Sequence, residues 1–291
     1  MSTTEAPAAS QVGRAIGMVL FAYFLFSFVD TSTKWLLGVG LASLQLAFMR
    51  YLIHLLITVA DRGRQASVPI SRKHRRIVLL RAFCLVSATV ANFFALAHLP
   101  LAVTAAILHV APVLVCLFAW PILGEQVRPI HWLAVFLGLV GVLIIVQPFG
   151  DGVNWYAVLM LYPATGMALY TVLTRKLAGA VPPATSQFYT GLLGTVVLLP
   201  FGVAVWETPP TAWAWTLTLG IGVFAWAGHE VLIRAHAYAG ASLLAPFGYA
   251  FVLYLAIAGW IVFDHIPEWY VGVGAVLICA AGLVIWRAQR A

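Results

Sequence analysis

Residues 101–147 read LAVTAAILHVAPVLVCLFAWPILGEQVRPIHWLAVFLGLVGVLIIVQ, two long apolar runs separated by the short polar link 124–129. A helix needs about 20 apolar residues to cross a hydrocarbon core ~30 Å thick. The first run, 101–123, is long enough for this, and the second, 130–147, is marginal. This stretch therefore predicts two consecutive membrane-spanning helices.

The same pattern continues in both directions along the 291-residue chain, in which 63% of residues are hydrophobic and only 9% are charged. Apolar runs of spanning length follow one another with short connections, which leaves no room for a soluble domain. We therefore predict an all-α integral membrane protein with ten transmembrane helices. The predicted spans are 15–35, 41–60, 77–97, 101–123, 130–147, 156–174, 187–205, 213–233, 242–263 and 270–286.

Basic residues gather in every second connection, most densely in 72–76. The alternate connections carry acidic residues instead, among them Asp151, Glu207 and Asp264. Because cytoplasmic loops are enriched in Lys and Arg, we expect both termini to be cytoplasmic in a bacterial-type inner membrane. The net charge of +7 then reflects topology, and no nucleic-acid partner is expected.

The two halves of the sequence share a register. Lys34 matches Arg175 (175 − 34 = 141), and Glu125 matches Asp264 (264 − 125 = 139). Each half has five predicted spans, and an odd number inserts the second copy upside down, so we expect two inverted five-helix repeats. The expected boundaries are a tail at 1–14, repeats at 15–147 and 155–286, an outer loop at 148–154 and a tail at 287–291.

Several motifs give the whole chain a family resemblance. They are LHVAPVLVCLFAWPILGEQ (108–126) and GLVGVLII (138–145), with LIRAHAYAGASLLAPFGYAFVLYLAIAGWIVFDHIP (232–267) and AAGLVIW (280–286). The chain resembles the ten-helix EamA-type members of the drug/metabolite transporter superfamily, whose exporters include the YddG-type amino-acid exporters. The family's Gly-Glu stands as Gly124-Glu125, whereas Phe263-Asp264 occupies the second copy. The resemblance implies a secondary transporter of small metabolites.

Span 1 carries Tyr23, Ser27, Asp30 and Lys34 on one helical face. Ionisable groups at membrane depth are costly and usually face a cavity or one another. Asp30 and Lys34, four residues apart, could form a structural ion pair. The alternative is a pathway lining or an outer gate.

Span 8 carries Trp226, His229 and Glu230 at helical spacing, followed by Arg234. These residues could form a packing or inner-gate cluster. His229 and Glu230 could alternatively titrate together during a transport cycle.

The remaining polar residues in the spans allow either a pathway role or a bond between helices. We expect Lys34, Arg50, His229 and Glu230 to act in gating or coupling. The pathway candidates are Tyr23, Ser27, Asp30, Asn92, His109, Tyr162, Tyr170, Trp226 and Tyr249.

The sequence contains no GxxxxGK[ST] phosphate loop and no HExxH motif, so neither ATP, a metal nor another cofactor is expected. We predict a non-enzymatic carrier that moves small metabolites, such as aromatic or other neutral amino acids, outward by alternating access. Other organic metabolites or drugs remain alternative substrates, and a passive channel or a membrane enzyme is the alternative function. Its partners are the substrate and the lipid bilayer, and a monomer is one option for the oligomeric state.

Overall fold

The computed structural model describes residues 9–62, 70–99, 101–108, 110–146, 155–264 and 269–288, and every regular element among them is a helix. The first half holds α1 (Ala9–Gly38), α2 (Ser43–Arg62), α3 (Arg72–His98), α4 (Leu101–Leu108), α5 (Ala111–Leu123) and α6 (Pro129–Val146). The second holds α7 (Trp155–Leu159), α8 (Leu161–Leu177), α9 (Pro183–Ala204), α10 (Ala212–Tyr238), α11 (Ala241–Leu244), the 3₁₀ helix η1 (Ala245–Tyr249), α12 (Ala250–Phe263) and α13 (Trp269–Ala288).

Six helical segments in the described part of the chain are long and apolar enough to cross a bilayer. Three of the predicted spans are interrupted: the fourth is split into α4 and α5, the sixth into α7 and α8, and the ninth into α11, η1 and α12. Pro112, Pro163 and Pro246 lie close after the three breaks. Proline cannot donate a backbone hydrogen bond and disfavours a helical conformation in the residue before it, which explains the interruptions.

Helix boundaries recur with a separation of 140 residues. Helices α3 and α10 both have 27 residues and begin 140 positions apart (212 − 72 = 140). Ser71 and Thr211 directly precede these helices. Each side-chain hydroxyl accepts a hydrogen bond from the backbone N–H of the third residue of its helix. Gly124 and Asp264, also 140 apart, both end a helix in the left-handed conformation. Asp264 therefore corresponds to Gly124 in backbone position. The sequence register had matched Asp264 to Glu125, which is one residue further along the chain.

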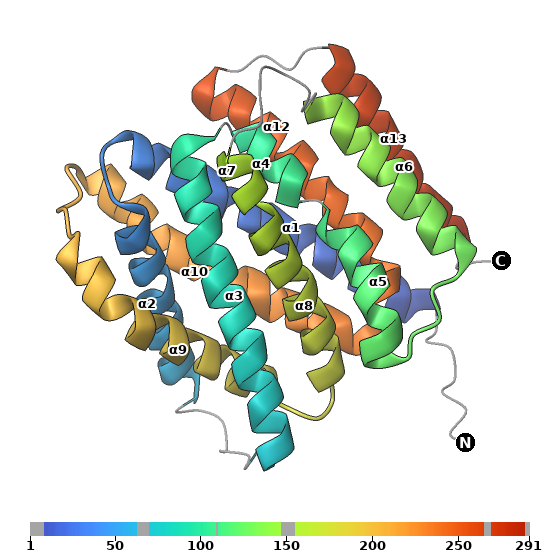
Figure 1. Ribbon diagram of the computed structural model, residues 1–291, viewed down its shortest axis with the longest axis horizontal. Helices are drawn as coiled ribbons and strands as arrows, with labels where there is room; N and C mark the ends of the chain where they lie inside the picture. Colours follow the sequence, from blue (N-terminus) through green and yellow to red (C-terminus); the bar gives the residue numbers. More distant parts are fainter. Residues whose placement is uncertain are drawn as a thin grey trace.

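Helices of the two halves pack against one another, with α1 beside α10, α3 beside α8, α2 beside α9 and α6 beside α13 (Figure 1). The last pair approaches closely at Gly141, where an added Cβ would lie 2.8 Å from the Gly274 carbonyl oxygen. Small residues allow such close approach between membrane helices. The main buried cluster accordingly contains residues of both halves.

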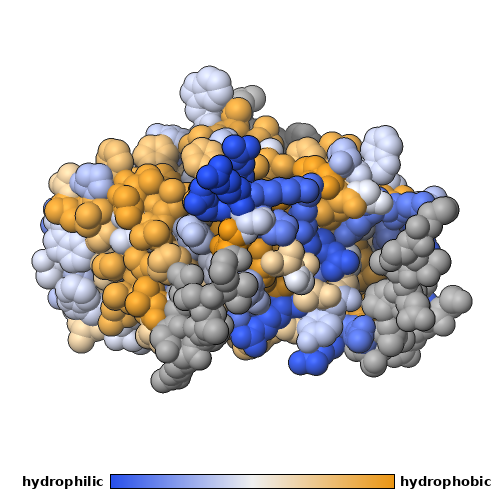
Figure 2. Space-filling view, turned by 90° about the horizontal axis from the view of Figure 1, so that it is seen from below, coloured by the Kyte–Doolittle hydropathy of each residue, from blue (hydrophilic) through white to orange (hydrophobic). Residues whose placement is uncertain are grey.

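Large apolar side chains cover the outside of the bundle. Trp120, Phe136, Ile261 and Val276 are all more than 60% exposed. Figure 2 shows the molecule from below the view of Figure 1. Hydrophilic side chains gather over the middle of this lower face, and hydrophobic side chains flank them. An apolar belt with polar ends suits a protein surrounded by lipid.

Candidate functional site: a polar cavity between the two halves

A cavity of about 80 Å³ lies in the centre of the bundle. One ordered water needs only ~10–15 Å³ by the same measure, so this space is larger than a single hydration site. It is lined from α1, α2, α3, α4, α5, α8, α10 and α12, so both halves contribute. The residues used below are Tyr23, Phe26, Asp30, Arg50, Thr89, Asn92, Phe93, Met167, His229 and Phe251.

Arg50, on α2, is 6% exposed and carries the positive charge of the cavity wall. Its Nη1 donates to the Tyr51 hydroxyl at 3.2 Å and also to Thr89 Oγ1. Its Nη2 lies 3.0 Å from Nε2 of His229 on α10. The buried guanidinium is therefore held by groups from both halves.

His229 connects Arg50 to a second buried arginine. Because a guanidinium has only donors, His229 Nε2 accepts from Arg50, and the ring proton lies on Nδ1, 2.9 Å from the Tyr170 hydroxyl. That hydroxyl also accepts from Arg81 Nη2 at 2.6 Å. The chain Arg50–His229–Tyr170–Arg81 thus holds the imidazole neutral in this conformation, between two cations.

Asp30, on α1, carries the negative charge of the cavity wall and is 8% exposed. Asn92 Nδ2 lies 3.4 Å from both of its carboxylate oxygens. The possible pairing of Asp30 with Lys34 does not occur: Lys34 Nζ instead donates to the carbonyls of Leu96 and Leu99, at 2.8 and 2.9 Å. Lysine near a helix end reaches the free carbonyls of α3, and this leaves Asp30 facing the cavity.

Two buried polar atoms of the cavity wall have no hydrogen-bond partner, the Nε of Arg50 and the Oδ1 of Asn92. Leaving a buried polar group unpaired costs about 1–3 kcal/mol. A water molecule or a bound ligand in the cavity would supply the missing partners.

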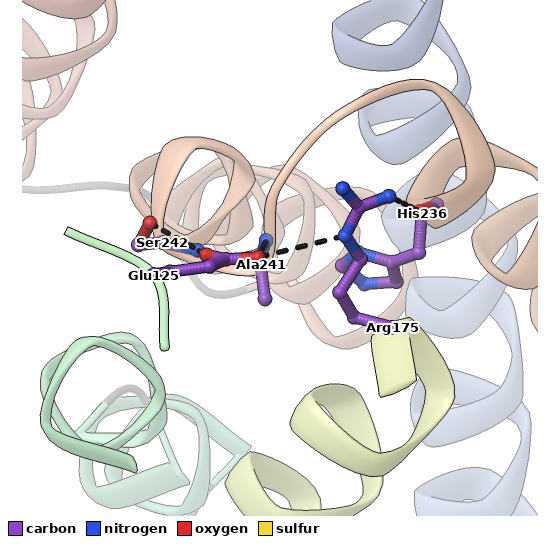
Figure 3. Close-up of polar contacts among 5 residues, drawn as sticks. All are labelled: Glu125, Arg175, His236, Ala241 and Ser242. Carbon is purple, nitrogen blue, oxygen red and sulfur yellow. Dashed lines mark hydrogen bonds and ion pairs between the residues drawn. The ribbon is translucent and has the colours of Figure 1, made fainter. Parts of the chain in front are cut away.

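A second set of contacts joins the two halves near the end of α5 (Figure 3). Glu125, just after α5, accepts from the backbone N–H groups of Ala241 and Ser242, each at 3.2 Å, and from the Ser242 hydroxyl at 2.8 Å. Its carboxylate lies 3.5 Å from Arg175 Nε, and Arg175 donates to the His236 carbonyl at 2.5 Å. We call Glu125, Arg175, His236, Ala241 and Ser242 the Glu125 latch.

The Glu125 latch lies beside a smaller pocket that continues from the central cavity. This pocket shares Tyr23, Pro112 and Met167 with the cavity and reaches His236 and Thr171. Glu125 belongs to the first half, and its partners belong to the second. The latch thus joins the halves where the pocket ends.

The cavity brings together Tyr23, Asp30, Arg50, Asn92 and His229 of the predicted site residues, and Tyr170 reaches it through His229. The structure places the others elsewhere, and His109 lies outside the described residues. Ser27 donates to the Phe24 carbonyl of its own helix, and the Trp226 carbonyl accepts from Gln187. Glu230 forms an ion pair with Arg234 at 2.7 Å, and Tyr249 donates to the Val135 carbonyl. The Tyr162 side chain is 48% exposed.

Arg81 and Thr89 were missed as site residues. Arg81 is fully buried and bonds Thr174, Thr190 and Tyr170, although its position near the predicted start of span 3 indicated an interfacial side chain. Helix α3 begins at Arg72, which places Arg81 well inside the helix. The longer helix, with five basic or His residues at its start (72–76), was the available signal.

Comparison with known proteins identifies one transporter family along most of the chain. The EamA-like transporter family matches at residues 13–147 and again at 154–287. A solved crystal structure with 19% identity covers 97% of this chain and 98% of its own, with a TM-score of 0.75, and supports the fold alone.

Three relatives carry names that state a transported molecule. The pseudopaline exporter CntI of Pseudomonas aeruginosa is 30% identical, over 94% of this chain and 96% of its own. A riboflavin transporter of Rhizobium johnstonii is 30% identical, over 97% of this chain and 93% of its own. An S-adenosylmethionine uptake transporter of Rickettsia bellii is 23% identical, over 94% of both.

Proposed function

Because the chain belongs to the EamA-like transporter family, we propose that it is a secondary carrier that moves small metabolites across the inner membrane by alternating access. The observation that carries this proposal is the central cavity, which helices of both halves line and whose wall contains one carboxylate and one guanidinium. A site at the interface of two repeats can be exposed to either side when the halves rock against one another.

We also propose that the two halves are inverted repeats, and two observations support this. Helix boundaries recur 140 residues apart, and the contact of α1 with α10 has its counterpart in the contact of α8 with α3. In Figure 1, α3 begins at the lower edge, whereas α10 begins at the upper left and runs downward. Counterpart helices that run in opposite directions are expected of two inverted five-helix repeats.

The Glu125 latch, at one end of the pathway, fits one state of such a cycle. The Glu125 latch ties the two halves together beside the pocket that leads from the cavity. Basic residues at this end favour a cytoplasmic location by the positive-inside rule, with both termini on the same side. The latch then acts as the inner gate.

We propose neutral or aromatic amino acids as the substrate class and export as the direction. The relatives carry chemically different molecules, and the names include both an exporter and an uptake transporter, so family membership alone does not select a substrate. The cavity wall, with one carboxylate, one guanidinium and aromatic rings, favours a small molecule with both charges. Export follows the name of the pseudopaline exporter CntI, which is 30% identical to this chain.

Flux in proteoliposomes tests the proposal. The purified protein is reconstituted and given a panel of radiolabelled amino acids, with and without an imposed pH gradient. We expect saturable uptake and acceleration of labelled influx by unlabelled substrate on the opposite side, which a passive channel does not show. Absence of saturation, or of counterflow for every solute on the panel, would reject the carrier. A response to the pH gradient identifies proton coupling, and its absence identifies exchange or facilitation.

A further inference from the structure

The charge of Arg50 is not neutralised by contact with a carboxylate. Among the residues that the structure describes, the ion pairs are those of Arg175 with Glu125 and Arg234 with Glu230. Burying an arginine without an acidic partner is costly, and here neutral groups hold it in place. No carboxylate of the described residues therefore contacts the guanidinium.

The donor count of Arg50 shows which of its N–H groups remain unused. A guanidinium has five N–H donors, and three are used by Tyr51, Thr89 and His229. The Nε–H, which is unpartnered, and one Nη2–H remain. Neighbouring Nε and Nη2 donors match the two oxygens of a carboxylate and bind it in a bidentate manner.

The α1–α3 wall of the cavity has the complementary chemistry. Asp30 has no ion pair among the described residues, and Asn92 keeps its Oδ1 without a donor. Both are acceptors, and both line the cavity with Arg50. An ammonium group with three N–H donors satisfies such a pair of acceptors.

Apolar and aromatic residues make up much of the remaining wall, with Tyr23, Phe26, Phe93, Met167 and Phe251 prominent among them. The Phe26 ring lies 4.6 Å from the His229 ring, centroid to centroid, and Tyr23 lies 5.9 Å from Phe251. These side chains offer contact area to an apolar substituent and exclude water from the charges.

We propose that the cavity recognises a zwitterion through both of its charges, with Arg50 binding the carboxylate and Asp30 and Asn92 binding the ammonium group. This assignment rests on the proposed carrier function and deepens it. It makes Arg50 and Asp30 the two specificity-determining residues, each responsible for one substrate charge.

The test compares a neutral amino acid with two analogues, its carboxamide, which lacks the carboxylate, and its N-acetyl derivative, which lacks the ammonium group. Each competes for flux in proteoliposomes, and each is also tested for thermal stabilisation of the purified protein. A lost charge-assisted contact is worth about 1.5–3 kcal/mol, so the analogues should bind about 10- to 100-fold more weakly.

Variants assign each charge to its residue. Arg50→Gln should abolish the preference for the amino acid over its carboxamide while keeping the preference over the N-acetyl form. Asp30→Asn should do the reverse. Arg50→Lys retains the charge without the paired donors and should give an intermediate preference, which keeps the test open if Arg50→Gln does not fold. Arg75→Gln and Asp264→Asn, at exposed positions, are the matched controls.

The outcomes separate the inference from the function. Flux of amino acids with equal competition by both analogues overturns charge recognition and leaves the carrier standing. Stabilisation by the zwitterion that depends on Arg50, without any flux, supports the site and rejects the carrier. Neither flux nor stabilisation overturns both.

Discussion

Tyr170 is the residue on which the buried polar network depends. Its hydroxyl accepts from Arg81 and lies 2.9 Å from the His229 Nδ1 that donates to it. Arg81 and His229 come from different halves and do not otherwise meet in the described network. A single phenol oxygen therefore links Arg81 to the histidine that holds Arg50.

We expect Tyr170→Phe to lower both stability and flux. Removing the hydroxyl leaves two buried donors unpaired, each of which costs about 1–3 kcal/mol. Thermal unfolding in detergent measures the first effect, and proteoliposome flux the second. Tyr162→Phe, on the same helix but with an exposed ring, should match the wild type in both. A Tyr170→Phe protein as stable and active as wild type would show that the network is dispensable.

At the scale of elements, the ends of helices meet between the halves. The Glu125 carboxylate satisfies the first N–H groups of α11, which no residue of α11 itself can reach. The charge also suits the positive end of a helix. The C-terminal end of α5 is thereby tied to the start of the segment that leads into α12.

Weakening the Glu125 latch should open the inner end of the pathway. Glu125→Gln keeps the shape of the side chain and removes the charge that pairs with Arg175. We expect a cysteine at Thr171, in the pocket beside the latch, to react several-fold faster with an impermeant thiol reagent from the latch side. The measurement uses a background without Cys84, Cys116 and Cys279.

Asp264→Asn is the control for the latch, since it changes a carboxylate at the equivalent turn of the other half. It should leave labelling at position 171 unchanged. Equal labelling in the wild type and Glu125→Gln would show that the carboxylate charge does not hold the gate.

The pairing of α6 with α13 gives a prediction about stability. Gly141→Leu places a side chain against the Gly274 carbonyl, a backbone atom that cannot move aside. Overpacking of this kind typically costs about 1–3 kcal/mol, so the melting temperature and folded yield should fall. Gly272→Leu, on α13 with no atom near the added Cβ, should behave as wild type. If both leucine variants have the same stability, the close contact is not important.

At the scale of the whole molecule, the distribution of charge predicts its orientation. In the same cysteine-free background, Ser71→Cys, at the start of α3, and Thr208→Cys, between α9 and α10, both lie at exposed positions outside helices. We expect an impermeant reagent to label the first from the cytoplasmic side and the second from the opposite side. Labelling from one side would contradict both the topology and the inverted repeats.

The sequence by itself determined the helical architecture and the positions of most helices. Spanning length and hydropathy are local properties, so each apolar run predicts a helix without knowledge of its neighbours. The repeat was also visible, because it lies in the register of the residues. The three interrupted spans were harder to predict, since a proline breaks one helix and is tolerated in another, as Pro121 inside α5 shows.

Only the tertiary structure decided which polar residues meet. Arg50 and His229 are 179 residues apart in the chain and contact each other because α2 and α10 pack together. Asp30 and Lys34 are close in sequence, yet they bind Asn92 and the carbonyls at the end of α3. Inside a membrane, a polar side chain takes the partner that helix packing brings within reach, and that choice is not encoded in local spacing.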